Sequence, residues 1–257
     1  MLPNQIWIAY KTIVIKELKR CFRIWPQTIL PPAITMTLYF VIFGRLIGSQ
    51  LRHIEGYTYM QYIVPGLIMM SVITNAYINA SSSFYGAKFQ RSIEELLVSP
   101  TPNVIILLGY ISGSVARALI VGVLVTTIAL LFTHLGIHHA VLMLGVVIMT
   151  SVFFATAGVI NGVYAKSFDD VSWVPTFLIT PLTYFGGVFF SISMLSGVWQ
   201  KIAYFNPIFY IINAFRYSLL GISGANVVLS AMVMLFVTIA AFFYALYLLR
   251  TSEGLRN

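Results

Sequence analysis

Long stretches without any charged residue constrain this chain more than any other feature. Five of them are 21 to 48 residues long, at positions 24–44, 56–87, 118–165, 171–200 and 217–249. A helix needs about 20 mostly apolar residues to cross the hydrocarbon core of a bilayer. Because backbone groups in lipid must be paired within the protein, such stretches predict helices. The sequence therefore predicts an all-α polytopic membrane protein.

The composition of the 257 residues supports this class and excludes others. Hydrophobic residues make up 59% of the chain and charged residues 9%, a balance that excludes a water-soluble domain. The alternating apolar segments of a porin-type barrel are absent. The net charge of +8 comes from Lys and Arg beside the apolar stretches, which favours membrane orientation and anionic lipid over nucleic acid. The only cysteine, Cys21, predicts a free buried thiol, with lipidation as the alternative.

The N-terminal residues 4–25 predict an amphipathic helix that lies on the membrane surface. At 100° per residue, apolar and aromatic residues gather on one side: Trp7, Tyr10, Val14, Leu18, Cys21, Phe22 and Trp25. Basic residues gather on the other side: Lys16, Lys19, Arg20 and Arg23. Interfacial helices show this pattern, with aromatic residues at the headgroup boundary and cations toward anionic lipid. The alternative is a simple orientation signal ahead of the first crossing.

Six crossings are expected, at about 27–47, 58–83, 104–133, 140–164, 173–190 and 226–249. The chain is then one transmembrane domain, 1–257, with an interface helix (4–25), a six-helix membrane domain (26–250) and a cytoplasmic tail (251–257). With both termini on one side, that side holds ten Lys and Arg: Lys11, Lys16, Lys19, Arg20, Arg23, Lys88, Arg91, Lys166, Arg250 and Arg256. The opposite side holds four: Arg45, Arg52, Lys201 and Arg216. Since cytoplasmic loops carry the excess of Lys and Arg, both termini are expected in the cytoplasm.

The loop after the second crossing, Lys88–Pro102, predicts a short cytoplasmic helix. Phe89, Ile93 and Leu96 share one helical face, while charged residues occupy the rest: Lys88, Arg91, Glu94 and Glu95. Pro100 and Pro102 end the helix. An apolar face amid mixed charges suits docking into a groove on another protein, and an ordinary solvated loop helix is the alternative.

The segment before the last crossing, Ser191–Gly221, is mostly apolar although it is expected outside. Asn206 suits a helix N-cap, Pro207 the first helical position, and Phe205 with Tyr210 a hydrophobic staple. A helix from Pro207 to Leu220 would be about 21 Å long, which is too short to cross. Together with residues 195–204 it predicts a re-entrant helical hairpin in the outer leaflet, with an interfacial surface helix as the alternative.

Polar residues at helical spacing run down the second crossing: Ser71, Asn75, Asn79 and Ser82. They either line a path for a solute or hold helices together by hydrogen bonds. Arg117 lies within the third crossing, where it either reaches back to the interface or belongs to a structural pair, a functional charge being the alternative.

Several kinds of active site are absent from the sequence. There is no phosphate-binding loop of the G-x-x-x-x-G-K-[ST] type, and no nucleophile–base set or metal motif stands out. His134, His138 and His139 fit an exposed loop better than a metal site. All seven acidic residues fall in loops, tails or the surface helix, so coupling to protons or sodium is disfavoured. A transporter of this kind needs a motor on a partner.

The order of these pieces resembles the membrane subunit of ABC-2-type (type V) exporters. Four stretches carry the resemblance: "IWPQTILPPAITMTLYFVIFG" (24–44), "YMQYIVPGLIMMSVITNAYINASSSFYGAKFQRSIEELLVSPTP" (59–102), "FDDVSWVPTFLITPLTYFGGVFFS" (168–191) and "FNPIFYIINAFRYSLLG" (205–221). The resemblance implies a homodimeric permease in the bacterial inner membrane, joined to two copies of a separate ATP-binding subunit. ATP and Mg would bind on that partner, and no cofactor is expected on this chain.

The resemblance also implies roles for particular residues. Those coupling to the ATPase are Lys88, Phe89, Arg91, Glu94, Glu95 and Leu96, with the interface helix from Trp7 to Trp25 as a second contact. Candidates for the substrate path are Ser71, Asn75, Asn79, Thr180, Thr183 and Tyr184, and those for an outer gate are Asn206, Pro207 and Arg216. The first and fifth crossings would meet the other protomer. Substrates in the family include drugs, lipids and glycans, so the fold does not name one.

Three other functions stay open at this point. A channel or ion-coupled carrier would transport without a partner, and a non-transporting scaffold would anchor a cytoplasmic enzyme. A membrane-embedded enzyme would need a polar catalytic cluster, which the sequence does not offer.

Overall fold

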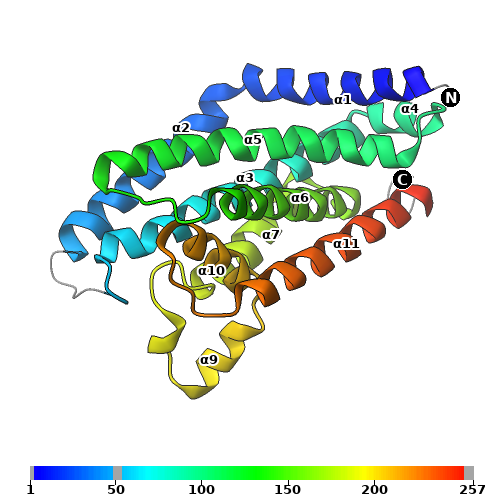
Figure 1. Ribbon diagram of the computed structural model, residues 1–257. Coiled ribbons are helices and arrows are strands. Elements are labelled where there is room, and N and C mark those ends of the chain that lie inside the picture. The colour runs from blue at the N-terminus through cyan, green and yellow to red at the C-terminus, as the bar shows by residue number, and fades with distance from the viewer. Residues whose placement is uncertain (1–2, 49–53, 252–257) are drawn as a thin grey trace.

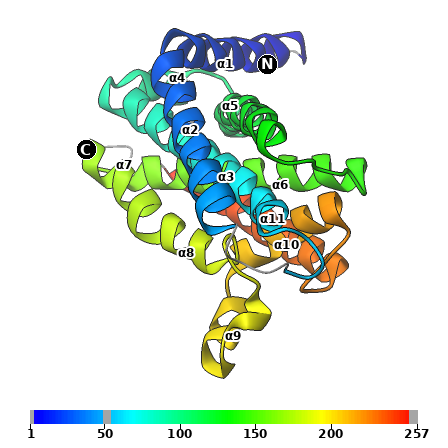
Figure 2. The same ribbon diagram turned by 90° about the vertical axis from the view of Figure 1, so that its left-hand side faces the viewer.

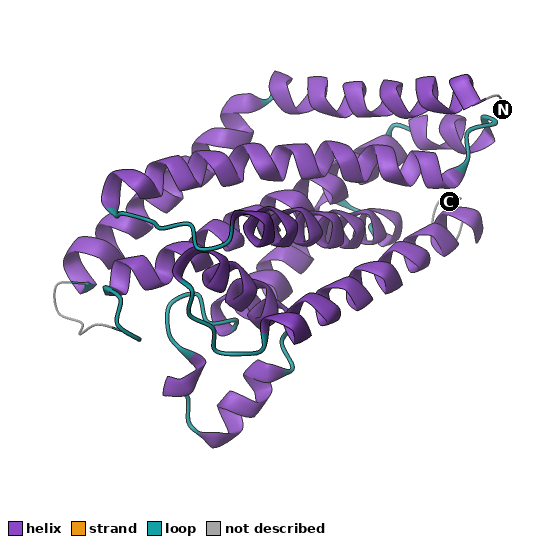
Figure 3. Ribbon diagram, in the orientation of Figure 1, coloured by secondary structure: helices purple, strands orange, loops and turns teal. Residues whose placement is uncertain are grey.

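The computed structural model describes residues 3–48 and 54–251, and this part of the chain is helical throughout except for turns and short loops (Figure 3). The first half contains α1 (Pro3–Arg23), α2 (Trp25–Tyr39), the π-helical η1 (Phe40–Ile47), α3 (Tyr59–Phe89), α4 (Ser92–Val98) and α5 (Asn103–Phe132). The second half contains α6 (Ala140–Tyr164), α7 (Phe168–Val174), η2 (Pro175–Ile179), α8 (Thr180–Phe185), η3 (Ile192–Met194), α9 (Gly197–Tyr204), α10 (Pro207–Leu220) and α11 (Val227–Thr251).

Helix α3 is the centre of the bundle. It contacts both α5 and α6, and 83% of the residues in its most apolar 18-residue stretch are buried. Helix α1 runs along α5 on one side, and α11 runs along α6 on the other (Figure 1). A helix with apolar or small residues all round belongs in the interior of a bundle, which explains why α3 takes this place.

Glycines set the close approach of α6 to α3. A Cβ atom at Gly158 would lie 2.5 Å from the carbonyl oxygen of Tyr77, and one at Gly162 would lie 3.0 Å from that of Ser81. Small residues four apart let two helix backbones touch, which is a common way to pack helices in membranes.

Five of the six expected crossings are helices that are long and apolar enough to span a membrane: α2 with the start of η1, α3, α5, α6 and α11. The remaining one, at about 173–190, differs from the expectation. It is a succession of α7, η2 and α8, which have 7, 5 and 6 residues. Pro175 and Pro181 lack the N–H that an α-helix needs, and the π-helical turn between them accommodates the loss.

The expected hairpin before the last crossing consists of two unequal helices. Helix α10 packs against α3, α6, α8 and α11, whereas α9 projects away from the bundle (Figure 1). The predicted ends of α10 are confirmed: the Ile208 N–H donates to Asn206 Oδ1 at 3.0 Å, and Gly221 ends the helix with φ +74°. The staple is wrong, because Phe205 is 89% exposed and the Tyr210 hydroxyl donates to the Tyr204 carbonyl.

Two of the sequence predictions fall largely outside the described residues. Only Thr251 of the expected tail 251–257 is described, and Arg52 and Arg256 lie outside as well.

Candidate functional site

Helix α4 is shorter than expected, and it is set at an angle to the helix before it. Helix α3 ends at Phe89, and Arg91 takes the left-handed conformation with φ 58° before α4 begins at Ser92. The short helix expected within Lys88–Pro102 therefore covers only Ser92–Val98, because the chain turns at Gln90 and Arg91 before it. Ile93 is fully buried and anchors α4 to the bundle, while Glu94 and Glu95 are exposed in its first turn.

Lys88 and Phe89 belong to the end of α3. The Lys88 ammonium donates to the carbonyls of Val163 and Ala165 at 2.8 and 3.0 Å, so it caps the C-terminal end of α6. Phe89 is 67% exposed and packs edge-on against Phe168, with ring centroids 5.5 Å apart. Of these two expected contact residues, Phe89 is free to meet a partner and Lys88 is engaged within the chain.

A hollow of about 370 Å³ separates α4 from α1. Its lining comes from α1, α4 and α5: Thr12, Ile13, Lys16, Ser92, Glu95, Leu96 and Tyr110. Lys16 of the surface helix and Glu95 of α4 thus border the same depression. The two segments expected to contact a partner form one continuous surface.

Helix α1 exposes its aromatic residues but has a second, inward face. Trp7 of α1 is 62% exposed and Trp25, the first residue of α2, is 51% exposed, and Lys16, Lys19 and Arg23 of α1 are exposed as well. The inward face, spaced by four residues, consists of Ile13, Glu17 and Cys21, all at most 5% exposed. Gly109 and Gly113 of α5 receive it, since Cβ atoms there would lie 2.4 Å from Ile13 and Glu17 side-chain carbons.

Glu17 and Arg20 carry charge into this interface. Glu17 Oε2 accepts a hydrogen bond from Ser83 Oγ at 2.6 Å and pairs with Arg20 Nη2 at 3.2 Å. Arg20 also donates to Asn79 Oδ1 of α3 at 2.8 Å. Arg20 is therefore bonded inside the protein, whereas Lys16, Lys19 and Arg23 of α1 are exposed.

Arg117 continues the same network toward the middle of α5. It is 8% exposed and donates to Asn79 Oδ1 at 3.2 Å and to Asn75 Oδ1 at 3.3 Å. Asn79 in turn donates to Ser114 Oγ at 2.9 Å. Arg117 is therefore hydrogen-bonded to side chains of α3, and Asn75 and Asn79 connect α3 to α5 as interhelical hydrogen bonds do in membranes.

The three candidate substrate-path residues in the fifth expected crossing, Thr180, Thr183 and Tyr184, differ in their hydrogen-bond partners. The hydroxyls of Thr180 and Thr183 donate to carbonyls of their own helical segment, at 2.9 and 2.6 Å. Tyr184 is 37% exposed, and its hydroxyl lies 3.2 Å from that of Tyr39 in α2. Tyr184 therefore joins α8 to the first crossing at the surface of the chain.

Two residues of α10 attach this helix to its surroundings. Asn206 Nδ2 donates to the Leu182 carbonyl at 2.6 Å. Arg216 donates to the carbonyls of Tyr62 and Gly187 at 3.3 and 2.7 Å, and its guanidinium lies 4.0 Å from the centre of the Tyr62 ring. Arg216 is 5% exposed, so it lies inside the bundle and is no exposed loop cation.

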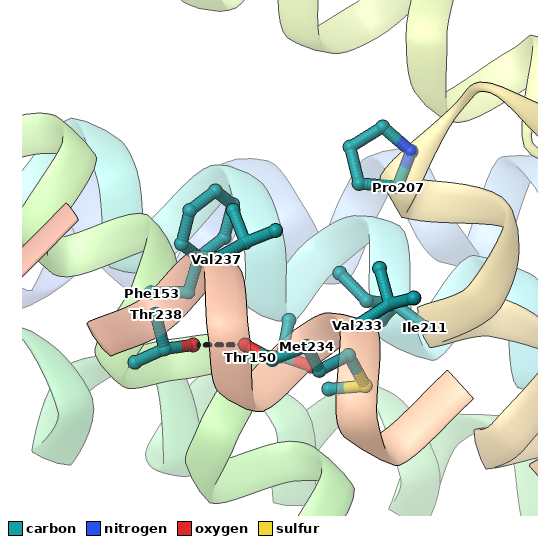
Figure 4. Close-up of a pocket in the computed structure, with 8 residues that line it drawn as sticks. All are labelled: Thr150, Phe153, Pro207, Ile211, Val233, Met234, Val237 and Thr238. Carbon is teal, nitrogen blue, oxygen red and sulfur yellow. Dashed lines mark hydrogen bonds between the residues drawn. The ribbon is translucent and has the colours of Figure 1, made fainter. Parts of the chain in front are cut away.

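The pocket beside Pro207 is too small for a ligand. It measures about 10 Å³ and is lined by eight residues of α6, α10 and α11, shown in Figure 4: Thr150, Phe153, Pro207, Ile211, Val233, Met234, Val237 and Thr238. The Thr238 hydroxyl donates to the Met234 carbonyl at 2.7 Å, within its own helix. A cavity of this volume holds about one water.

No group of three His, Cys, Asp or Glu is placed to hold a metal ion within residues 3–48 and 54–251. His138 and His139 instead pack against each other and against Tyr217, and both of their backbone N–H groups donate to the Ser218 carbonyl. At the start of α7 the Lys166 N–H donates to Asp170, which lowers the pKa of that carboxyl below its usual value.

Comparison with known proteins identifies the family. Residues 8–220 match the model of the ABC-2 type transporter family. The chain is 53% identical over 251 residues to the inner membrane transport permease YadH of Escherichia coli K12, covering 98% of both chains. It is 27% identical over 217 residues to nodulation protein J of Rhizobium leguminosarum bv. viciae, covering 83% of both. The chain belongs to the ABC-2 type transporter family.

Membership of the ABC-2 family confirms the resemblance in the sequence and fixes the role of the chain. It is the transmembrane permease of an ABC transporter and a multi-pass inner-membrane protein. It is not itself an enzyme, since ATP is hydrolysed on a separate subunit with which such permeases associate.

Sequence reasoning on this ABC-2 permease missed the partners of its buried arginines. Glu17 was placed on the surface helix, yet it is 1% exposed, and Ser83 and Ser114 were not singled out. A signal for Glu17 was present: Gly109 and Gly113 are four residues apart, as are Ile13 and Glu17. A small-residue face on one helix marks where another helix packs closely.

Proposed function

We propose that this permease exports a drug, a lipid or a glycan, driven by ATP hydrolysed on two partner subunits. The observation that carries the proposal is the exposed surface of α4. Glu94 and Glu95 are exposed, Phe89 is 67% exposed beside them, and Val98 is 88% exposed at the far end of the helix. Charged and apolar groups side by side on a rigid short helix suit a groove on a partner protein.

A push on α4 would be passed to the membrane helices because α4 is firmly held. Ile93 is buried in a cluster that includes Phe84 of α3 and Ile106 and Tyr110 of α5. The Lys88 bridge to α6 and the Glu17–Arg20–Asn79 network connect α3 to its neighbours at the same end. ATP would favour one arrangement of these helices through a difference in contact free energy between the two states.

The proposed topology has six crossings and both termini in the cytoplasm. The start of α1, the end of α11 and α4 lie near the same end of the long helices, at the right of Figure 1, which supports an even number of crossings. The segment α7–η2–α8 would be the fifth of them, with its polar first turn outside the bilayer. At about 1.5 Å per residue, α3 and α5 would extend some 45 Å, which leaves their inner ends beyond a core of about 30 Å.

The proposed homodimer uses the face formed by α2 and α8, which lie on the same side of the molecule (Figure 2). Large apolar side chains are exposed there: Ile34 57%, Leu38 55%, Phe177 62% and Leu182 41%. Exposed apolar surface on a membrane crossing suits contact with either lipid or a second protomer. We favour a second protomer here, because the substrate path is expected to run between two protomers. Tyr184 and the threonines of α8 would border that path, and the end of α10 with Asn206, Pro207 and Arg216 would form part of its outer gate.

The test is assembly with the cognate ATPase subunit. Reversing both charges, Glu94→Arg with Glu95→Arg, is expected to reduce co-purification of the ATPase at least about tenfold, because attractive charges at the proposed interface become repulsive and a loss of about 1.4 kcal/mol already weakens binding tenfold. Lys201→Glu in α9, at the other end of the molecule, is the matched control and keeps wild-type assembly. Full assembly and full substrate-stimulated hydrolysis in the double variant would contradict the docking role of α4.

A further inference from the structure

A second pocket, of about 320 Å³, lies between α2, α3 and α5. Twelve residues line it: Gln27, Thr28, Pro31, Pro32, Thr35, Met36, Met70, Ser71, Thr74, Asn75, Ile78 and Arg117. More than half of these residues are polar or charged, although α2, α3 and α5 are all apolar enough to span a membrane. Polar groups are costly in such surroundings unless they have partners.

Two polar groups on the pocket wall lack partners. Ser71 Oγ and Arg117 Nε are buried without a hydrogen bond, and their residues are 3% and 8% exposed. Arg117 uses its two terminal nitrogens on the amide oxygens of Asn79 and Asn75, which leaves Nε available. A buried guanidinium with a free donor normally finds an acceptor, since an unmade bond at a charged group is expensive.

The charge of Arg117 is also unbalanced. Among the side chains that the structure describes, the one ion pair joins Glu17 to Arg20, and no described carboxylate lies within pairing distance of Arg117. Its two partners are neutral amides, which accept hydrogen bonds but carry no negative charge. A ligand that brings an anion into the pocket would supply both the missing charge and the missing acceptor.

The position of the pocket fits a group at the surface of the bilayer. It lies directly after the turn from α1 to α2, and Trp25, which is 51% exposed, precedes the lining residues Gln27 and Thr28. Tryptophan gathers at the level of lipid headgroups, where phosphates lie. The paired prolines at 31 and 32, which also line the pocket, lack the N–H groups that other residues of α2 provide.

We propose that this pocket binds the phosphate of an anionic amphiphile, held by Arg117 and Ser71 of the permease. Arg117 Nε and the Ser71 hydroxyl donate to the phosphate oxygens, while Asn75 and Asn79 keep the guanidinium in place. The acyl chains remain in the bilayer alongside α2. The site is independent of the export direction and of the ATPase contact, so it stands or falls separately from the proposed function.

The test measures phospholipid binding to the full-length purified permease by native mass spectrometry and by thermal unfolding. Short-chain phosphatidylglycerol is compared with phosphatidylcholine of the same chain length, which carries a phosphate but no net charge. Arg117→Gln is expected to weaken binding of phosphatidylglycerol at least about tenfold, and Ser71→Ala about threefold. Arg250→Gln removes an exposed cation at the end of α11 and is expected to leave the affinity unchanged.

Ser71→Ala keeps the test valid should Arg117→Gln fail to fold. The variant removes a hydroxyl that has no partner in the protein, so the ligand-free permease should keep its stability while losing affinity. Inorganic phosphate supplies the second arm. Competition with phosphatidylglycerol that requires Arg117 identifies a soluble phosphate as a ligand, whereas binding of the lipid without such competition identifies the headgroup. Wild-type affinity for phosphatidylglycerol in both variants, or equal affinity for phosphatidylcholine, would overturn the site.

Discussion

Two arginines are buried among the residues that the structure describes, Arg117 and Arg216, and they are held in contrasting ways. Arg216 of α10 donates to two backbone carbonyls and lies over the Tyr62 ring. Arg117 of α5 donates to two side-chain amides, keeps one donor free, and borders a pocket of about 320 Å³. Arg216 joins three segments of the chain through its hydrogen bonds and its ring contact. Arg117 has a nitrogen, Nε, that lacks a hydrogen-bond partner.

The difference shows that burial of a charge in a membrane bundle does not by itself reveal its role. Backbone carbonyls cannot rotate away, so Arg216 fixes the position of α10 against α3 and the residues after α8. Amide side chains can turn, so Arg117 can keep its place while it gains or loses another partner. The number and kind of hydrogen-bond partners separates a structural cation from a candidate binding residue.

The largest effect is expected for Arg216→Met. It removes the hydrogen bonds to the carbonyls of Tyr62 and Gly187 and the contact with the Tyr62 ring, which together should cost about 3 kcal/mol of unfolding free energy. Thermal unfolding of the purified permease measures the loss, with the exposed Arg250→Met as control. An unchanged unfolding temperature would show that Arg216 has no structural role, and the contrast between Arg216 and Arg117 would then not hold.

A smaller effect is expected for Arg20→Met. Glu17, which is 1% exposed, would keep only Ser83 as a partner, and we expect a loss of about 2 kcal/mol because Arg20 itself is 29% exposed and partly screened. Adding Glu17→Gln should recover most of the stability, since the stranded charge is then gone. Lys19→Met, on the exposed side of α1, is the control. A double variant that is no better than Arg20→Met would contradict the pairing.

The sequence was informative where local rules decide the structure and silent where distant segments meet. The long apolar helices, the Asn206 cap and the Gly221 stop follow from composition and short spacing, and the structure has them. The turn at Arg91 could not be predicted from the sequence, because no Gly or Pro lies at this position. The partners of Arg216 did not show either, since Tyr62 is 154 positions away in the chain.

The contact between α1 and α5 can be tested through its glycines. Gly113→Ala would place a Cβ atom 2.4 Å from a Glu17 side-chain carbon, and the resulting displacement of α1 should cost about 1–2 kcal/mol. Gly145→Ala in α6 is a matched control, because no atom lies within 4 Å of its Cβ position and alanine favours a helix. The two variants should therefore shift the unfolding temperature in opposite directions, and a shared direction would show that α1 is not closely packed.

The smallest effect on stability is expected for Arg117→Met, although its side chain is almost as buried as that of Arg216. The substitution removes a charge whose desolvation is costly, and the amides of Asn75 and Asn79 can turn toward each other or toward Ser114. We therefore expect a change below about 1 kcal/mol in the unfolding free energy of the ligand-free protein. A loss as large as that of Arg216→Met would make Arg117 a second structural cation. A small loss would instead leave the free Nε and the adjoining pocket as the reason for a charge at this depth, because a residue that contributes little to folding must be justified by what it binds.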